Sequence, residues 1–251
     1  MFLKIRFFAV VFLVGQVGLA SFTRAQSLPA TPHTPDLLGI YPGMPGPAAK
    51  AQLQKLSSTI NVHTLSPASM GFSLTIPSHN RETIAVYLTQ EPNDPFVWLI
   101  ERGQNFDQAN PMSKDALLAG LHQKYGKETL KWDKGGGGLY LYWIFDQSGK
   151  LLTTADQTLQ ACESGQFSLY MNNGLPQAPT QVEQACFKSY FAVKAGFNLG
   201  PNGMLYSYNV ELVNLPYAHR AAMNTANAKN AVDQKAQQDL IKRANQNKPT
   251  F

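Results

Sequence analysis

The chain has 251 residues, of which 44% are hydrophobic, 11% aromatic and 15% charged, and its formal net charge is +5. This apolar content is sufficient for a packed core and excludes a mainly disordered chain. The 19 glycines and 16 prolines fall below the share that marks collagenous or low-complexity chains, so they indicate a folded domain rich in turns.

The first 25 residues have the features of a secretory signal peptide. Lys4 and Arg6 precede the apolar run 7–14, and small residues before Gln26 predict cleavage after Ala25. An uncleaved membrane anchor is the alternative, but the strongly apolar part is too short to span a bilayer comfortably. No cysteine follows the segment, which argues against a lipid-attached N-terminus, and no later segment predicts a transmembrane helix. We therefore expect an exported protein, located in the periplasm or outside the cell.

Cleavage changes the charge balance. It would remove Lys4, Arg6 and Arg24 but no acidic residue, and would lower the formal net charge from +5 to +2. The remaining charges alternate in sign along the chain without a cluster of Lys and Arg. Nucleic acid is therefore not expected as a partner, because binding it requires a run of cations that neutralises phosphates.

The chain has two cysteines, Cys162 and Cys186. In an exported protein, oxidising conditions favour a disulfide between them. Closing a loop of this length would stabilise the fold by about 3.5 kcal/mol in the chain-entropy description. A catalytic or metal-binding thiol is the alternative, but no His or Cys lies at ligand spacing from either residue. We expect a disulfide that closes an insertion over residues 148–186.

The N-terminal part of the mature chain predicts a leader and a first unit over residues 37–110. Residues 26–36 hold three prolines among small polar residues, which predicts a flexible leader. Residues 45–58 predict an amphipathic helix, because apolar side chains recur at helical spacing after Pro47. Strands of an antiparallel meander are expected at 71–76, 82–90 and 96–104.

A second unit is expected over residues 111–215. Ser113 as the N-cap and Gly126 as the stop predict a helix between them. Strands are expected at 139–146, 187–197 and 204–213.

The C-terminal region, residues 216–251, predicts a helix over 217–244 and a tail. Val232, Ala236 and Leu240 recur at helical spacing, so the helix has a thin apolar stripe.

The two predicted helix starts are similar. A shift of 68 positions aligns residues 43–53 with residues 111–121 and matches a Met, two Ala and a Leu. Such a match also arises by chance between two amphipathic helices, so a tandem repeat is one of two interpretations. The expected fold class is α+β: an antiparallel sheet with short helices packed on one face, interpretable as two tandem helix-plus-three-strand units, plus a C-terminal helix.

The segment Gly-Ile-Tyr-Pro-Gly-Met at residues 39–44, followed by a short helix and strands, resembles the opening of envelope domains of the SmpA/OmlA lipoprotein type. The related β-lactamase inhibitor protein has two such units in tandem. This chain differs in having Pro45 at the usual place of a Ser or Thr cap, no clear second helix before the strands and no lipid-attachment cysteine. The resemblance implies a non-catalytic module that binds another envelope or secreted protein through its sheet face. No functional residue carries over.

The sequence contains no familiar catalytic or metal-binding motif, so no cofactor or metal is expected. The histidines show no close ligand spacing; they are His33, His63, His79, His122 and His219. Ser78 beside His79 lacks a nucleophile elbow and is more typical of a hairpin turn. The alternative function is a secreted hydrolase with a site assembled from scattered residues. In such a site, His79 or His122 would meet a carboxylate and a serine in a pocket.

The expected functional surface is aromatic. In the predicted strand 139–146 the odd-numbered residues form an apolar face, so Tyr140 and Tyr142 point to the other side. Tyr87 has the corresponding register on its own strand. We expect these three tyrosines on an open sheet face, where they would anchor a protein partner. The alternative is that they cover a half-exposed sheet under the C-terminal helix. The expected function is a non-catalytic protein-binding or assembly module, and not an enzyme.

Overall fold

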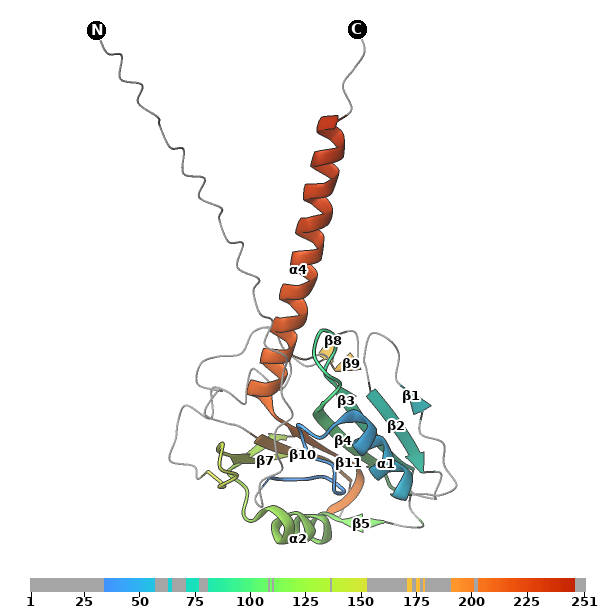
Figure 1. Ribbon diagram of the computed structural model, residues 1–251. Helices are drawn as coiled ribbons and strands as arrows, with labels where there is room; N and C mark the ends of the chain where they lie inside the picture. Colours follow the sequence, from blue (N-terminus) through green and yellow to red (C-terminus); the bar gives the residue numbers. More distant parts are fainter. Residues whose placement is uncertain are drawn as a thin grey trace, which may run out of the picture.

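A computed structural model describes residues 34–56, 63–64, 71–76, 81–107, 109, 111–135, 137–152, 171–172, 175–176, 178, 191–200 and 203–246. The predicted α+β class is confirmed: one antiparallel sheet carries two short helices on one face, and a long helix ends the described chain (Figure 1). The predicted signal peptide, the Cys162–Cys186 pair and His79 lie outside the described residues.

Three helices are present in the described chain: α1 (Gly46–Leu56), α2 (Lys114–Tyr125) and α4 (Leu215–Gln246). The predicted ends of α2 are confirmed. The Ser113 side chain accepts a hydrogen bond from the amide of Ala116, and Gly126 ends the helix at a positive φ of 83°.

The main sheet is built from nine strands: β1 (His63–Thr64), β2 (Gly71–Ile76), β3 (Glu82–Leu88), β4 (Val97–Asn105), β5 (Met112–Ser113), β6 (Leu130–Gly135), β7 (Gly138–Phe145), β10 (Phe191–Leu199) and β11 (Met204–Val213). A small hairpin, β8 (Met171–Asn172) and β9 (Leu175–Pro176), interrupts the chain between β7 and β10. The sequence analysis missed β1, β5, β6 and this hairpin. β6 has the sequence Leu-Lys-Trp-Asp-Lys-Gly, which lacks the apolar run typical of a buried strand.

The strand order β1-β2-β3-β4-β11-β10-β7-β6 divides the sheet into two topologically equivalent halves. In each half a helix precedes an antiparallel meander of four strands: α1 precedes β1 to β4, and α2 precedes β6, β7, β10 and β11. The last strands of the halves, β4 and β11, pair at the centre. Each half therefore has four strands, one more than in the tandem interpretation of the sequence.

Met44 and Met112, which the shift of 68 positions aligns, have equivalent places in the two halves. The carbonyl of Met44 accepts a hydrogen bond from the amide of Val97, at the start of β4. Met112 pairs with Leu205, at the start of β11. Both methionines stand directly before a helix and pack partly buried against the core. The structural positions thus agree with the sequence alignment.

The main core lies between the sheet and helices α1 and α2, on a side that we call the helix face. The predicted alternation of β7 is confirmed here, because Leu139, Leu141, Trp143 and Phe145 all point into this core. Trp143 is fully buried, and its indole N–H donates a hydrogen bond to the carbonyl of Gly126 at 2.8 Å. The end of α2 is thereby attached to the middle of β7.

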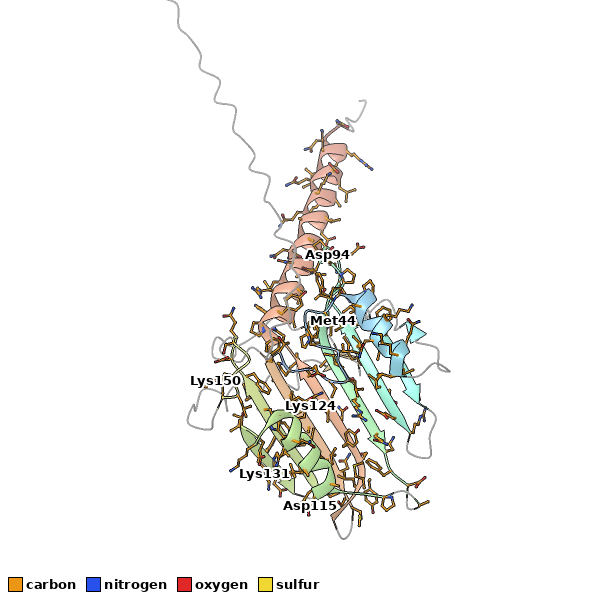
Figure 2. The ribbon with its side chains drawn as sticks, turned by 60° about the horizontal axis from the view of Figure 1, so that its bottom comes forward. Met44, Asp94, Asp115, Lys124, Lys131 and Lys150 are labelled. Atoms are coloured by element: carbon orange, nitrogen blue, oxygen red, sulfur yellow. The ribbon has the colours of Figure 1, made fainter. Side chains whose placement is uncertain are left out.

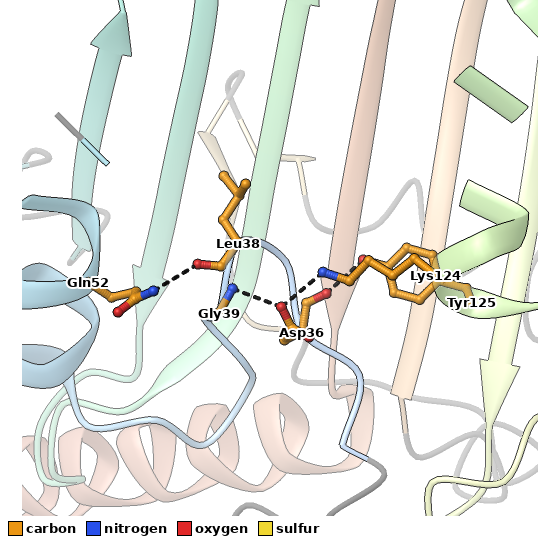
Figure 3. Close-up of polar contacts among 6 residues, drawn as sticks. All are labelled: Asp36, Leu38, Gly39, Gln52, Lys124 and Tyr125. Atoms are coloured by element: carbon orange, nitrogen blue, oxygen red, sulfur yellow. Dashed lines mark hydrogen bonds and ion pairs between the residues drawn. The ribbon is translucent and has the colours of Figure 1, made fainter. Parts of the chain in front are cut away.

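A turn at residues 36–39 forms hydrogen bonds with both α1 and α2 on this face (Figure 3). Asp36 accepts hydrogen bonds from the amide of Gly39 at 2.8 Å and from Lys124 Nζ at 2.9 Å. The Tyr125 hydroxyl donates to the Asp36 carbonyl at 2.7 Å, and Gln52 of α1 donates to the carbonyl of Leu38 at 3.2 Å. Asp36, the last residue of the segment predicted as a flexible leader, is therefore held in place by both the turn and α2.

Helix α4 starts on the opposite side of the sheet and then leaves it (Figures 1 and 2). Its first turn packs Leu215, Tyr217 and Ala218 into a second apolar cluster. Asn93, from the loop between β3 and β4, holds the next turns by donating to the Ala221 carbonyl at 3.0 Å. From residue 229 to residue 246 every helix residue is exposed.

Candidate functional site

The side of the sheet opposite α1 and α2, which we call the groove face, has an apolar half and a polar half. The apolar half contains the second cluster, in which Tyr87, Trp98 and Tyr142 pack with the start of α4. The polar half holds a groove of about 370 Å³. Its exposed or half-buried lining side chains include Thr83, Asn105, Tyr140, Asn198, Ser207 and Asn209.

The groove follows one row of paired residues across the sheet. Strand pairing places Thr83 beside Gly103, Gly103 beside Asn209, Asn209 beside Gly196, and Gly196 beside Tyr140. The two glycines lie on either side of Asn209 and contribute no side chains, and the Tyr140 ring lies over Gly196. The groove therefore reaches the backbone at Gly103, with longer side chains in the rows on both sides.

At one end of the groove, two aromatic rings form a platform. Tyr140 on β7 pairs with Trp132 on β6, and their ring centroids lie 6.1 Å apart with planes tilted by 38°. The Tyr140 ring lies on Gly196, where an added Cβ would be only 3.1 Å from it. A glycine at 196 is thus required for the ring to lie against the sheet. Trp132 remains 48% exposed.

On one flank of the groove, charged residues form a row between the polar and apolar halves. Glu101 on β4 and Glu211 on β11 are directly paired in register. The Tyr87 hydroxyl donates to Glu101 at 3.0 Å, while Lys194 and Asn209 donate to Glu211 at 3.3 and 3.0 Å. Burial, together with the negative charge of Glu211, raises the pKa of Glu101 to about 7. Glu101 can therefore gain or lose a proton near neutral pH.

On the other flank, the side chains are neutral and polar. Asn198 and Ser207 are paired in register, and the Asn198 amide donates to the Ser207 hydroxyl at 2.8 Å. This bond leaves the Asn198 side-chain oxygen as an acceptor and the Ser207 hydroxyl as a donor.

The three tyrosines predicted as binding residues all lie on the groove face, but they do not form an open surface. Tyr87 is 7% exposed and Tyr142 is 4% exposed, so the expectation that they are open is wrong for both. They pack in the second cluster with the base of α4, which is the alternative weighed from the sequence. Tyr140 is half-buried and borders the groove.

Lys194 and Asn209, which line the groove, and Trp132, which lies beside it, were not predicted from the sequence. The sequence contains one indication for Trp132: it lies two positions after Leu130, so in a strand the two side chains share a face. Lys194 and Asn209 had none, since their roles depend on the pairing of strands far apart in the sequence.

One element of the alternative, a hydrolase site, is present elsewhere. His122 Nε2 lies 2.5 Å from Glu128 Oε2, and the His122 ring meets Trp143 edge-on at 6.2 Å. Trp143 points to the helix face, whereas the groove opens on the opposite side of the sheet. Within the described ranges, no serine is recorded as a partner of this pair, and no group of three potential metal ligands occurs.

Comparisons with protein-family models, with curated protein sequences and with solved structures found no match to this chain. In the described part of the chain, no helix is both long enough and apolar enough to cross a membrane.

Proposed function

We propose that this chain is a non-catalytic protein-binding or assembly module that docks onto another envelope or secreted protein through the outer part of α4. The observation that carries the proposal is the apolar stripe that the sequence predicts on this helix, Val232, Ala236 and Leu240. Val232 is 67% exposed and Leu240 is 64% exposed, so within the described chain the body does not bury the stripe.

The chemistry of the helix supports a role in recognition. Its outer part is rich in Ala, Gln, Lys and Arg, which favour helix formation, and Asp239 precedes Arg243 at the stabilising spacing of four residues. An isolated helix that buries nothing is nevertheless marginal in water. A partner groove that covers the aliphatic stripe would add the missing burial, which is the usual way an amphipathic helix is recognised.

Site-specific photo-crosslinking in the native host envelope tests the proposal. A photoreactive residue at position 232 or 240 should form adducts with one defined protein partner, to be identified by mass spectrometry. Gln234 and Gln238 are matched control positions, because the 3.6-residue repeat places them on the other side of the same exposed helix. The same partner should be recovered poorly from these positions.

The variant Val232→Gln/Leu240→Gln should abolish the adduct of a reporter at position 236, whereas Gln234→Ala/Gln238→Ala should leave it unchanged. Equal crosslinking from all positions, or adducts that survive the stripe variant, would contradict docking through the stripe. A stripe-dependent adduct between two copies of the chain would show self-assembly instead of a separate partner.

Export and the disulfide are part of the same proposal. N-terminal sequencing of the mature protein should begin at Gln26, and a sequence beginning at Met1 would rule out cleavage. Thiol labelling of unfolded, unreduced exported protein should leave Cys162 and Cys186 unmodified. Labelling of both would exclude the disulfide.

A further inference from the structure

The groove face presents a second surface whose chemistry differs from that of α4. The aromatic platform pairs the ring of Tyr140, which lines the groove, with the ring of Trp132, its neighbour on β6. Lys194 Nζ lies 5.5 Å from the centre of the Tyr140 ring and helps to hold it in place. Trp132 is 48% exposed, and an accessible aromatic ring is suited to stacking on a ligand with an apolar face.

Directly beside the platform, the groove offers neutral hydrogen-bonding groups. Asn198, Ser207 and Asn209 come from two adjacent strands and face the same side as Tyr140. The bonds they form with neighbouring side chains leave the oxygens of both amides and the Ser207 hydroxyl for a ligand. A ligand with many hydroxyl groups matches such a mixture, because each hydroxyl both donates and accepts.

The charges along the groove point to a neutral ligand. Lys194 and Glu211 are both largely buried and pair with each other, so the cation is already compensated. A phosphate, sulfate or uronate ligand would need an excess of cations, usually with bidentate arginine contacts. Besides this pair, the described residues that line the groove include one further charged side chain, Arg81 at the Thr83 end, and a single cation does not make such an excess.

The shape of the groove fits an extended chain. The row from Thr83 on β3 to Tyr140 on β7 crosses four inter-strand spacings, or about 19 Å. Its volume of about 370 Å³ is in the range of small-ligand sites. Gly103 lets a ligand approach the backbone closely, because an added Cβ there would have no neighbour nearer than 3.6 Å.

We propose that the groove is a binding site for a neutral oligosaccharide, which stacks the C–H face of one sugar ring on Trp132 and Tyr140 and hydrogen bonds to Asn198, Ser207 and Asn209. This site is independent of the docking of α4, and either proposal can fail without the other.

Fluorescence of the full mature protein tests the site directly. The chain has three tryptophans, of which Trp98 and Trp143 are buried, so iodide quenching reports mainly on Trp132. The probes are the tetrasaccharides of cellulose, chitin, starch and xylan. At least one should protect Trp132 from iodide in a saturable manner, and isothermal titration calorimetry should give the same affinity. Binding should change little between low and high salt, because the ligand is neutral.

Variants then locate the site. Trp132→Ala and Tyr140→Ala should each weaken binding in calorimetry by about tenfold or more, whereas Tyr140→Phe should retain it because the ring remains. Tyr206→Ala is the control, since Tyr206 is 60% exposed but is not among the residues that line the groove. Circular dichroism should show that all four variants remain folded.

Three results would overturn the proposal. The first is that none of the four probes protects Trp132 or gives a calorimetric signal at millimolar concentration. The second is binding that survives both Trp132→Ala and Tyr140→Ala, which would locate the sugar elsewhere. The third is that an unfolded polypeptide, tested as reduced casein, or the anionic glycan polygalacturonate protects Trp132 better than every neutral probe does.

Discussion

Glu101 and Glu211 face each other across the central pair of strands, where the two halves of the sheet meet. Glu211 has Lys194 as a direct partner, while Glu101 receives a hydrogen bond from the Tyr87 hydroxyl. Two neighbouring carboxylates in a partly buried position disfavour each other's charge. Ionisation of Glu101 therefore destabilises the fold at the junction between the two halves, and this effect depends on pH.

The replacement Glu101→Gln should stabilise the protein at pH 8. The pKa of Glu101 is raised in the folded state to about 7 from an ordinary value of 4.5, so the folded state binds this proton more tightly than the unfolded state does. The unfavourable contribution is absent below pH 4.5, grows between pH 4.5 and 7, and reaches at most about 3 kcal/mol above pH 7. Urea unfolding should show Glu101→Gln to be more stable than wild type at pH 8 and nearly equal at pH 4.5.

Glu91→Gln is the control for this experiment, because Glu91 is exposed in the loop after β3 and should show no such pH-dependent gain. A Glu101→Gln protein that is no more stable than wild type at pH 8 would show that ionised Glu101 carries no penalty.

Trp143→Ala should lower the free energy of unfolding by about 3 to 5 kcal/mol, because it opens a cavity in the helix-face core and removes the hydrogen bond to Gly126. Trp132→Ala, a change of the same size on an exposed ring, should cost less than about 1 kcal/mol. Equal losses in urea unfolding would mean that the burial of the two rings has been assigned incorrectly.

Tyr142→Ala and Tyr140→Ala should differ in their effect on stability, although the two residues are only two positions apart. Tyr142 is 4% exposed and packs among Leu215 and Tyr217, so its truncation should cost about 3 kcal/mol. Tyr140 borders the groove, so its loss should affect ligand binding more than stability. Thermal unfolding in which Tyr140→Ala is the less stable variant would reverse this assignment.

Asn93→Ala should loosen the base of α4 without unfolding the sheet. Asn93 is buried, and its amide reaches the Gln90 carbonyl, the Ala221 carbonyl and the Thr225 hydroxyl. Losing these bonds should cost about 1 to 3 kcal/mol locally. Hydrogen exchange should accelerate at the α4 amides around residues 221–225 and remain unchanged in β7 and β10. Asn105→Ala, at an exposed position of the groove, should leave α4 protection as in the wild type.

Several features of the fold could be predicted from the sequence because they depend on local chemistry. The limits of α2 follow from a hydroxyl N-cap at Ser113 and a glycine at 126 that accepts a positive φ. The two faces of β7 follow from the alternation of side chains along a strand, which assigned Trp143 to the core and Tyr140 to the other side. The apolar stripe of α4 likewise follows from helical periodicity.

The tertiary structure alone decided which residues of the groove face are covered and which are open. Tyr87, Tyr140 and Tyr142 have the same alternation in sequence, yet α4 starts over one half of the sheet and buries two of them with it. The groove and the pair of Glu101 and Glu211 arise from the pairing of β4 with β11, whose residues lie more than a hundred positions apart in the chain. Periodicity tells which way a side chain points, but not which distant strand or helix will lie beside it, because that choice depends on the packing of the whole core.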